Sequence, residues 1–240
     1  MLGNAATNIA FPLSTSCTAI SLLLGIGSAT NFSLKLGAGE EKESAEYAGN
    51  GICLMAIFGI ALFAVTTIFL TPMLKFFGAT SEVLPYAQEY TRITAIGFPF
   101  LIANTGMSKL ILADGSPRYS MTSMLVGAIV NTILDPIFIF VLGMGVKGAA
   151  LATVLSQSVG AVWILRFLTG KKTILLLKRS NMHLELKVFG PCLALGISTF
   201  VMLSTESLLS ISFTNSLSRY GGDVAVGAMT IITSINQLVA

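Results

Sequence analysis

Asp135 is the residue that most constrains the fold of this chain, because it is the one charge in a long apolar segment. No other charged residue lies between Arg118 and Lys147, a stretch long enough to cross a bilayer. A carboxylate at that depth costs about 2.5–3.5 kcal/mol on insertion scales, and such residues usually face a bundle interior and mark ion or substrate paths. Asn131 lies one helical turn earlier, on the same face. The pair predicts a cation site inside a membrane protein.

Composition and segment lengths predict an all-α, multi-spanning membrane protein with about seven transmembrane helices. The chain is 54% hydrophobic and 10% charged, with a mean hydropathy of +0.83. Its apolar runs are continuous and about bilayer length, unlike the alternating strands of an outer-membrane barrel. The expected spans are Ala6–Ser28, Gly51–Leu74, Tyr90–Ala113, Tyr119–Leu142, Gly148–Leu168, Val188–Phe213 and Val224–Ala240.

Basic residues divide unequally between the two sides of the membrane that these spans define. One side carries Lys35, Lys42, Lys109, Arg118, Arg166, Lys171, Lys172, Lys178, Arg179 and Lys187, and the other only Lys75, Arg92, Lys147 and Arg219. Cytoplasmic loops are enriched in Lys and Arg, so the first group is predicted to face the cytoplasm. The net charge of +3 then reflects topology, and no nucleic-acid partner is expected.

The chemistry-bearing residues do not form an enzyme pattern, so we expect neither an enzyme nor a bound cofactor. His183 is the lone histidine and falls in the longest loop, where we expect it to be exposed. A Ser/His dyad or a His-Glu-x-x-His zinc motif is therefore excluded. Asp114 is expected in a cytoplasmic loop, which leaves no aspartate on a helix facing Asp135. A seven-helix receptor-like protein fits the helix count, but the last span has no lysine for a retinal Schiff base.

Several motifs, in order along nearly the whole chain, resemble the multidrug and toxic compound extrusion (MATE) family. They are Gly25–Thr30 with Leu36–Gly39, Gly97–Phe100, Asn131–Phe140, Gly143–Gln157 and Arg219–Gly222. Members of that family have twelve helices in two lobes, and the resemblance implies that this chain is a fragment covering about helices two to eight. The implied organisation is an amino-terminal lobe (1–170) lacking its first helix, a basic cytoplasmic inter-lobe loop (171–187), and the first two helices of the carboxy-terminal lobe (188–240).

The resemblance also implies a sodium or proton site formed by Asn131, Asp135, the carbonyl of Ala149 and Thr153. Sequence geometry allows the same grouping independently. If the turn between the two helices centres near Gly145, Asp135 and Thr153 lie roughly 15 and 12 Å from it, at almost the same depth. Carboxylate, amide, hydroxyl and carbonyl oxygens suit a small hard cation such as Na⁺. The family's remaining ligand, an aspartate on the first helix, is absent from this chain.

Two further groups are candidates for function. Glu206, near the middle of its span, matches an acid that some MATE proteins need in the carboxy-terminal lobe; its alternative is a hydrogen-bonded structural role. Flexible Met and aromatic side chains suit a promiscuous pocket for flat organic cations, although such residues more often pack between helices or face lipid. The pocket candidates are Phe98, Phe100, Met107, Phe138 and Met202.

The function expected from these observations is secondary active efflux. A monomeric multi-pass protein of a prokaryotic cytoplasmic membrane would export organic cations and other xenobiotics in exchange for Na⁺ or H⁺. Pro136 cannot hydrogen-bond to Thr132, so the helix is expected to bend beside Asp135. A lipid-linked oligosaccharide flippase of the same superfamily is the related alternative. It is disfavoured because no span has an interior Lys or Arg to hold a pyrophosphate.

Overall fold

The computed structural model describes residues 2–170, 173 and 185–239, and these form a bundle of long helices. Glycines with positive φ occupy the turns at Gly39, Gly78, Gly115, Gly143 and Gly145. The elements are α1 (Leu2–Gly37), α2 (Glu41–Ile68), α3 (Leu70–Phe76), α4 (Leu84–Ala113), α5 (Pro117–Pro136), the π-helix η1 (Ile137–Val141), α6 (Val146–Leu168) and α7 (Leu186–Val239).

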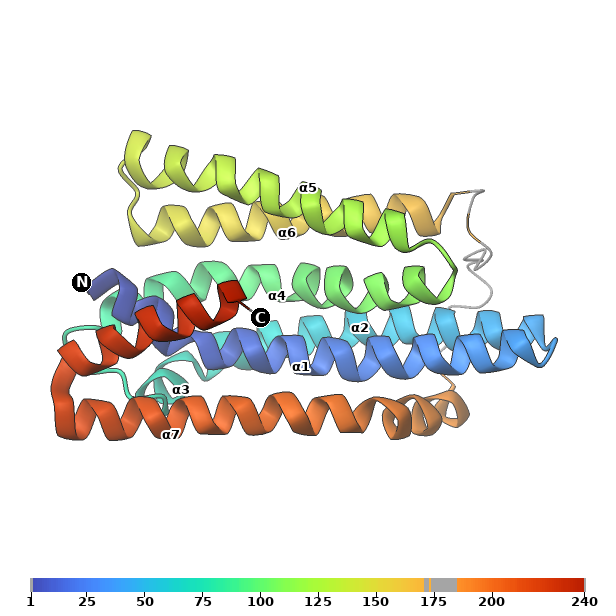
Figure 1. The fold of residues 1–240 in the computed structure, drawn as a ribbon, viewed down its shortest axis with the longest axis horizontal. Helices are drawn as coiled ribbons and strands as arrows, with labels where there is room; N and C mark the ends of the chain where they lie inside the picture. Colours follow the sequence, from blue (N-terminus) through green and yellow to red (C-terminus); the bar gives the residue numbers. More distant parts are fainter. Residues whose placement is uncertain (1, 171–172, 174–184, 240) are drawn as a thin grey trace.

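The helices lie nearly side by side in layers (Figure 1). The α5–α6 pair forms one edge, α4 comes next, α1 and α2 follow, and α7 packs along α1 at the opposite edge. The turns after α1 and α4 lie at one end of the bundle, together with the end of α6. The predicted cytoplasmic residues gather at this end, so we name it the cytoplasmic end.

Six helices in the described part of the chain are long and apolar enough to cross a membrane, one fewer than expected. They are Ala5–Gly37, Glu41–Ile68, Leu84–Ala113, Pro117–Val141, Val146–Leu168 and Lys187–Leu217. The expected seventh span, from Val224, is helical through Val239 but is not among them. It follows a break in α7 at Gly222 (φ 64°) and folds back over the bundle (Figure 1).

The apolar core lies between α1, α2 and α4 and reaches the cytoplasmic end of α6. Its fully buried side chains include Leu24 and Phe32 of α1, Met55 of α2 and Ile102 of α4. Backbones approach closely where glycines meet, because a Cβ on Gly25 of α1 would lie 2.7 Å from the Cα of Gly106 of α4. Small residues at such contacts allow van der Waals packing to hold membrane helices together.

The contact between α1 and α7 depends on two glycines in reciprocal positions. A Cβ on Gly27 of α1 would overlap the carbonyl oxygen of Cys192 of α7. A Cβ on Gly196 of α7 would likewise overlap the carbonyl oxygen of Leu23 of α1. We name this contact, formed by Gly27, Cys192, Gly196 and Leu23, the α1–α7 seam.

Candidate cation site

The turn between η1 and α6 brings the two halves of the candidate site onto neighbouring helices. Gly143 and Gly145 take positive φ angles of 65° and 56°, which only glycine adopts at little cost. The first turn of α6 then sits directly against η1, because a Cβ on Gly148 would lie 2.7 Å from the carbonyl oxygen of Phe138. This packing aligns α5 and α6 as an antiparallel pair, as the sequence predicted.

The bend expected at Pro136 takes a particular form. The α-helix α5 ends at Pro136, and the chain continues as the π-helix Ile137–Val141. A π-turn accommodates one additional residue and occurs frequently at functional sites. The carboxylate of Asp135 therefore lies immediately before a change in helix type, where backbone hydrogen bonding is already altered.

Asp135 and Asn131 present buried polar atoms that the protein leaves unpaired. Both residues are half-buried on α5. The Oδ1 atom of Asp135 and the Nδ2 atom of Asn131 are each buried without a hydrogen-bond partner among the described residues. An unsatisfied buried polar group costs about 1–3 kcal/mol, and more when charged, so such a pair indicates a site for an ion or water.

Thr153 and Ala149 of α6 supply two further oxygens that lie together. The Thr153 hydroxyl donates a hydrogen bond to the Ala149 carbonyl at 2.9 Å. Both oxygens keep lone pairs for a cation. One carboxylate with neutral oxygens suits a monovalent ion, and no cluster of three His, Cys, Asp or Glu residues occurs in the described part of the chain.

Three polar residues near this group were not predicted from the sequence. The charge of Asp135 acts on Tyr90 of α4, which is half-buried. Gln157, one turn beyond Thr153 on α6, and Asn104 of α4 each have a buried oxygen without a partner among the described residues. The four-residue spacing from Thr153 was a signal for Gln157, whereas Tyr90 and Asn104 are brought near α6 only by tertiary packing.

An exposed ion pair links the outer end of α4 to the start of α6. Lys147, in the first turn of α6, lies 3.0 Å from Glu89 of α4. Both side chains are about half exposed, so the pair contributes little energy by itself. It marks the place where the outer ends of α4 and α6 meet, next to Tyr90 in the sequence.

Glu206 lies apart from the Asp135 group. It is exposed on α7, and α7 packs mainly on α1. Its role as a second functional carboxylate stays a prediction.

The five residues predicted to line a substrate pocket do not gather in one cavity. Phe98 and Met107 are each 3% exposed and belong to the apolar core. Phe138 packs against Gly148, while Phe100 and Met202 are exposed on α4 and α7. Hydrophobicity alone does not distinguish a core side chain from a pocket side chain, which is why Phe98 and Met107 were included.

Two described residues within the predicted inter-lobe loop (171–187) hydrogen-bond to the bundle. The Thr173 hydroxyl donates to the Oδ1 atom of Asp114 at 3.0 Å, and both residues are buried. The backbone N–H of Glu185 donates to the Oδ1 atom of Asn50 at 2.9 Å. His183, expected to be an exposed loop residue, lies outside the described residues.

Comparison with known proteins gives the relationship of this chain. A family model described as MatE matches residues 4–137. The chain belongs to the MatE family. The predicted family, the all-α membrane fold and the multi-pass placement in the cytoplasmic membrane are thereby confirmed.

Relatives of this MatE chain include bacterial exporters. It is 26% identical over 90% of its length to the multidrug export protein MepA of Staphylococcus haemolyticus, covering 48% of that protein. It is 29% identical over 63% of its length to the FAD transporter of Shewanella oneidensis, covering 34% of it. The chain thus spans about half the length, or less, of the curated relatives it matches.

Solved structures of MATE transporters share the fold. One in an inward-facing conformation superimposes with a TM-score of 0.93 at 24% identity, covering 99% of this chain and 54% of that one. Another in an outward-facing conformation gives 0.86 at 26% identity, covering 98% and 52%.

Proposed function

We propose that this chain contributes the ion-coupling lobe of a secondary active exporter that moves organic cations and other xenobiotics out of the cell. The observation that carries the proposal is that Asp135 and Asn131 each hold a buried polar atom without a partner among the described residues. Both lie on α5, which packs against α6, the helix that carries Thr153 and Ala149. The multidrug export activity named for the staphylococcal relatives supports this substrate class.

In the proposed mechanism, Na⁺ binds the Asp135 carboxylate, with the Asn131 amide, the Thr153 hydroxyl and the Ala149 carbonyl completing its oxygen shell. A proton on Asp135 would neutralise the same charge. Either event lowers the cost of burying Asp135 and draws α5 toward α6. The change of helix type after Pro136 lets the outer end of α5 adjust. Exchange requires only that the ion and the substrate favour different states of the protein.

One transport experiment can show whether Asp135 or Glu206 couples ion binding to export. The full-length parent gene is expressed in an efflux-deficient bacterial host, and accumulation of a fluorescent organic cation is followed with and without sodium. We expect wild type and Glu89→Gln to lower accumulation, because Glu89 is only an exposed partner of Lys147. We expect Asp135→Asn to accumulate the dye at equal membrane expression.

The outcomes separate the two candidate sites. Normal export by Asp135→Asn would remove Asp135 from the mechanism, and loss of export by Glu206→Gln would move coupling to α7. A sodium requirement in wild type distinguishes Na⁺ from H⁺ coupling. If wild type leaves the dye unaffected, organic cations are the wrong substrate class, and a flavin such as that named for the Shewanella relative is the next substrate to assay.

A further inference from the structure

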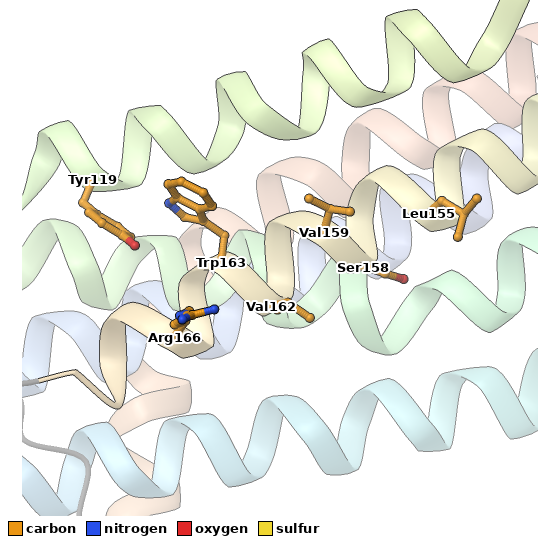
Figure 2. Close-up of a pocket in the computed structure, with 7 residues that line it drawn as sticks. All are labelled: Tyr119, Leu155, Ser158, Val159, Val162, Trp163 and Arg166. Carbon is orange, nitrogen blue, oxygen red and sulfur yellow. The ribbon is translucent and has the colours of Figure 1, made fainter. Parts of the chain in front are cut away.

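A groove of about 500 Å³ lies along α6 at its cytoplasmic half, apart from the cation site (Figure 2). Tyr119 of α5 and six residues of α6 between Leu155 and Arg166 line it. Leu155, Val159 and Val162 supply an apolar wall that is exposed on the surface of the bundle. In the same view the ring of Trp163 points from α6 toward α5, beside Tyr119, and Arg166 lies near the end of α6.

The lining residues of α6 occupy a face of the helix turned away from the cation site. Their positions repeat every three or four residues, which places them on one side of a 3.6-residue helix. Thr153, Gln157 and Gly160 lie on the opposite side by the same spacing, and Gly160 contacts Asn104 of α4. The groove therefore opens outward from the bundle, where a membrane protein meets lipid.

The groove has an apolar part toward the membrane interior and a cationic part at the cytoplasmic end of α6. A phospholipid has the matching arrangement, with acyl chains in the interior and a charged head group at the surface. Arg166 is exposed in the last turn of α6 and has no acidic partner among the described residues. Between Ser116 and Thr169 the only acidic residue is Asp135, which lies toward the opposite end of the pair. Among the described residues, the positive charge of Arg166 therefore forms no ion pair.

Aromatic side chains mark the depth of the headgroup region. Tyr119 stacks on Trp163 with ring centroids 5.9 Å apart and on Phe167 with centroids 4.0 Å apart. Tyr and Trp are enriched where a membrane helix crosses the lipid–water interface. From Leu155 to Arg166 the helix rises roughly 16 Å, about half of the ~30 Å hydrocarbon core, which is the thickness of one leaflet.

We propose that this groove binds one anionic phospholipid of the cytoplasmic leaflet. Its phosphate pairs with Arg166 beside Trp163 and Tyr119, and one acyl chain lies along Val162, Val159 and Leu155. Basic sites between transmembrane helices on the cytoplasmic side hold anionic lipid head groups by this charge complementarity. The bound lipid would join α5 to α6, the pair that carries Asp135.

The test compares two lipids that differ only in head-group charge. The purified chain is titrated with dioleoyl phosphatidylglycerol or dioleoyl phosphatidylcholine, and bound lipid is counted by native mass spectrometry. We expect wild type to retain one phosphatidylglycerol about fivefold more tightly than phosphatidylcholine, as one basic contact predicts. Arg166→Gln should abolish this preference. Lys42→Gln, which removes a 91% exposed charge from α2 at the same membrane side, should preserve it.

A second variant keeps the test decisive if head-group effects are small. Val162→Trp fills the apolar wall and should lower retention of both lipids while leaving the helical content unchanged. Equal retention of both lipids by wild type would overturn the proposal, as would an equal loss of preference in Lys42→Gln and Arg166→Gln. A dimer that Val162→Trp removes would also overturn it, because the groove would then belong to a second copy of the chain.

Discussion

Replacing Gly196 by alanine should separate α1 from α7, although alanine is the better helix former. The added Cβ would overlap the carbonyl oxygen of Leu23, which belongs to a helix backbone and cannot rotate away. Overpacking of this kind costs about 1–3 kcal/mol because the neighbouring backbone must shift. The α1–α7 seam is thus predicted to depend on the absence of one methyl group.

Gly127 of α5 provides a matched control inside a helix. A Cβ at Gly127 would lie 3.7 Å from the carbonyl oxygen of Ser156, an ordinary contact, so Gly127→Ala gains helix propensity without a clash. Alanine improves propensity by up to about 1 kcal/mol at either position. This gain largely cancels when the two variants are compared. The difference between their free energies of unfolding then reports the overpacking, and we expect Gly196→Ala to be less stable by about 1–3 kcal/mol.

The assay is unfolding of the purified chain by a denaturing detergent, followed by far-ultraviolet circular dichroism. A double variant extends it: Gly27→Ala with Gly196→Ala should cost less than the sum of the single changes, because the first substitution already separates the helices. If Gly196→Ala is as stable as Gly127→Ala, the close approach of the two backbones is wrong and the reasoning fails.

Three further predictions address other parts of the chain. Thr173→Val should lower the free energy of unfolding by about 1.5–3 kcal/mol and speed proteolysis after α6, because it removes a hydrogen bond to the Asp114 carboxylate; an unchanged proteolysis rate would contradict this. Cys53, which is half-buried, should react with a membrane-permeant maleimide faster than the fully buried Cys192, as mass spectrometry of timed samples would show. Gln157→Leu should raise the free energy of unfolding by about 1 kcal/mol, because it removes an unpaired buried oxygen; a thermal melt that shows destabilisation would refute this.

The sequence located most of the helices because the bilayer fixes their length and excludes charge from them. Hydrophobicity did not predict where a helix begins when its first turns carry charged residues. The span expected from Gly51 begins at Glu41, since acidic residues are favourable at a helix amino terminus and Lys35 pairs with Glu43 across the turn. The same span stops at Ile68, and a separate short helix, α3, follows. Apolar composition alone gives no sign of that break.

The sequence predicted only those residues of the candidate site that lie on the α5–α6 hairpin. Asp135 and Asn131 are readable from sequence because intramembrane polar residues are rare. Tyr90 could not be recognised, because its relation to Asp135 depends on how α4 packs against the hairpin. The predicted pocket residue Met107 lies in the apolar core, and its role in a substrate pocket stays a prediction.

The way α5 is attached has a consequence for how this protein is assembled in the membrane. Its only buried residues are Ser120 and Ser123, so α5 adds almost nothing to the apolar core. A helix that buries so little apolar surface is held in the bundle mainly by its contacts with α6, its partner across a short turn. We therefore expect the α5–α6 hairpin to leave the translocon as a unit and to dock after α1, α2 and α4 have packed.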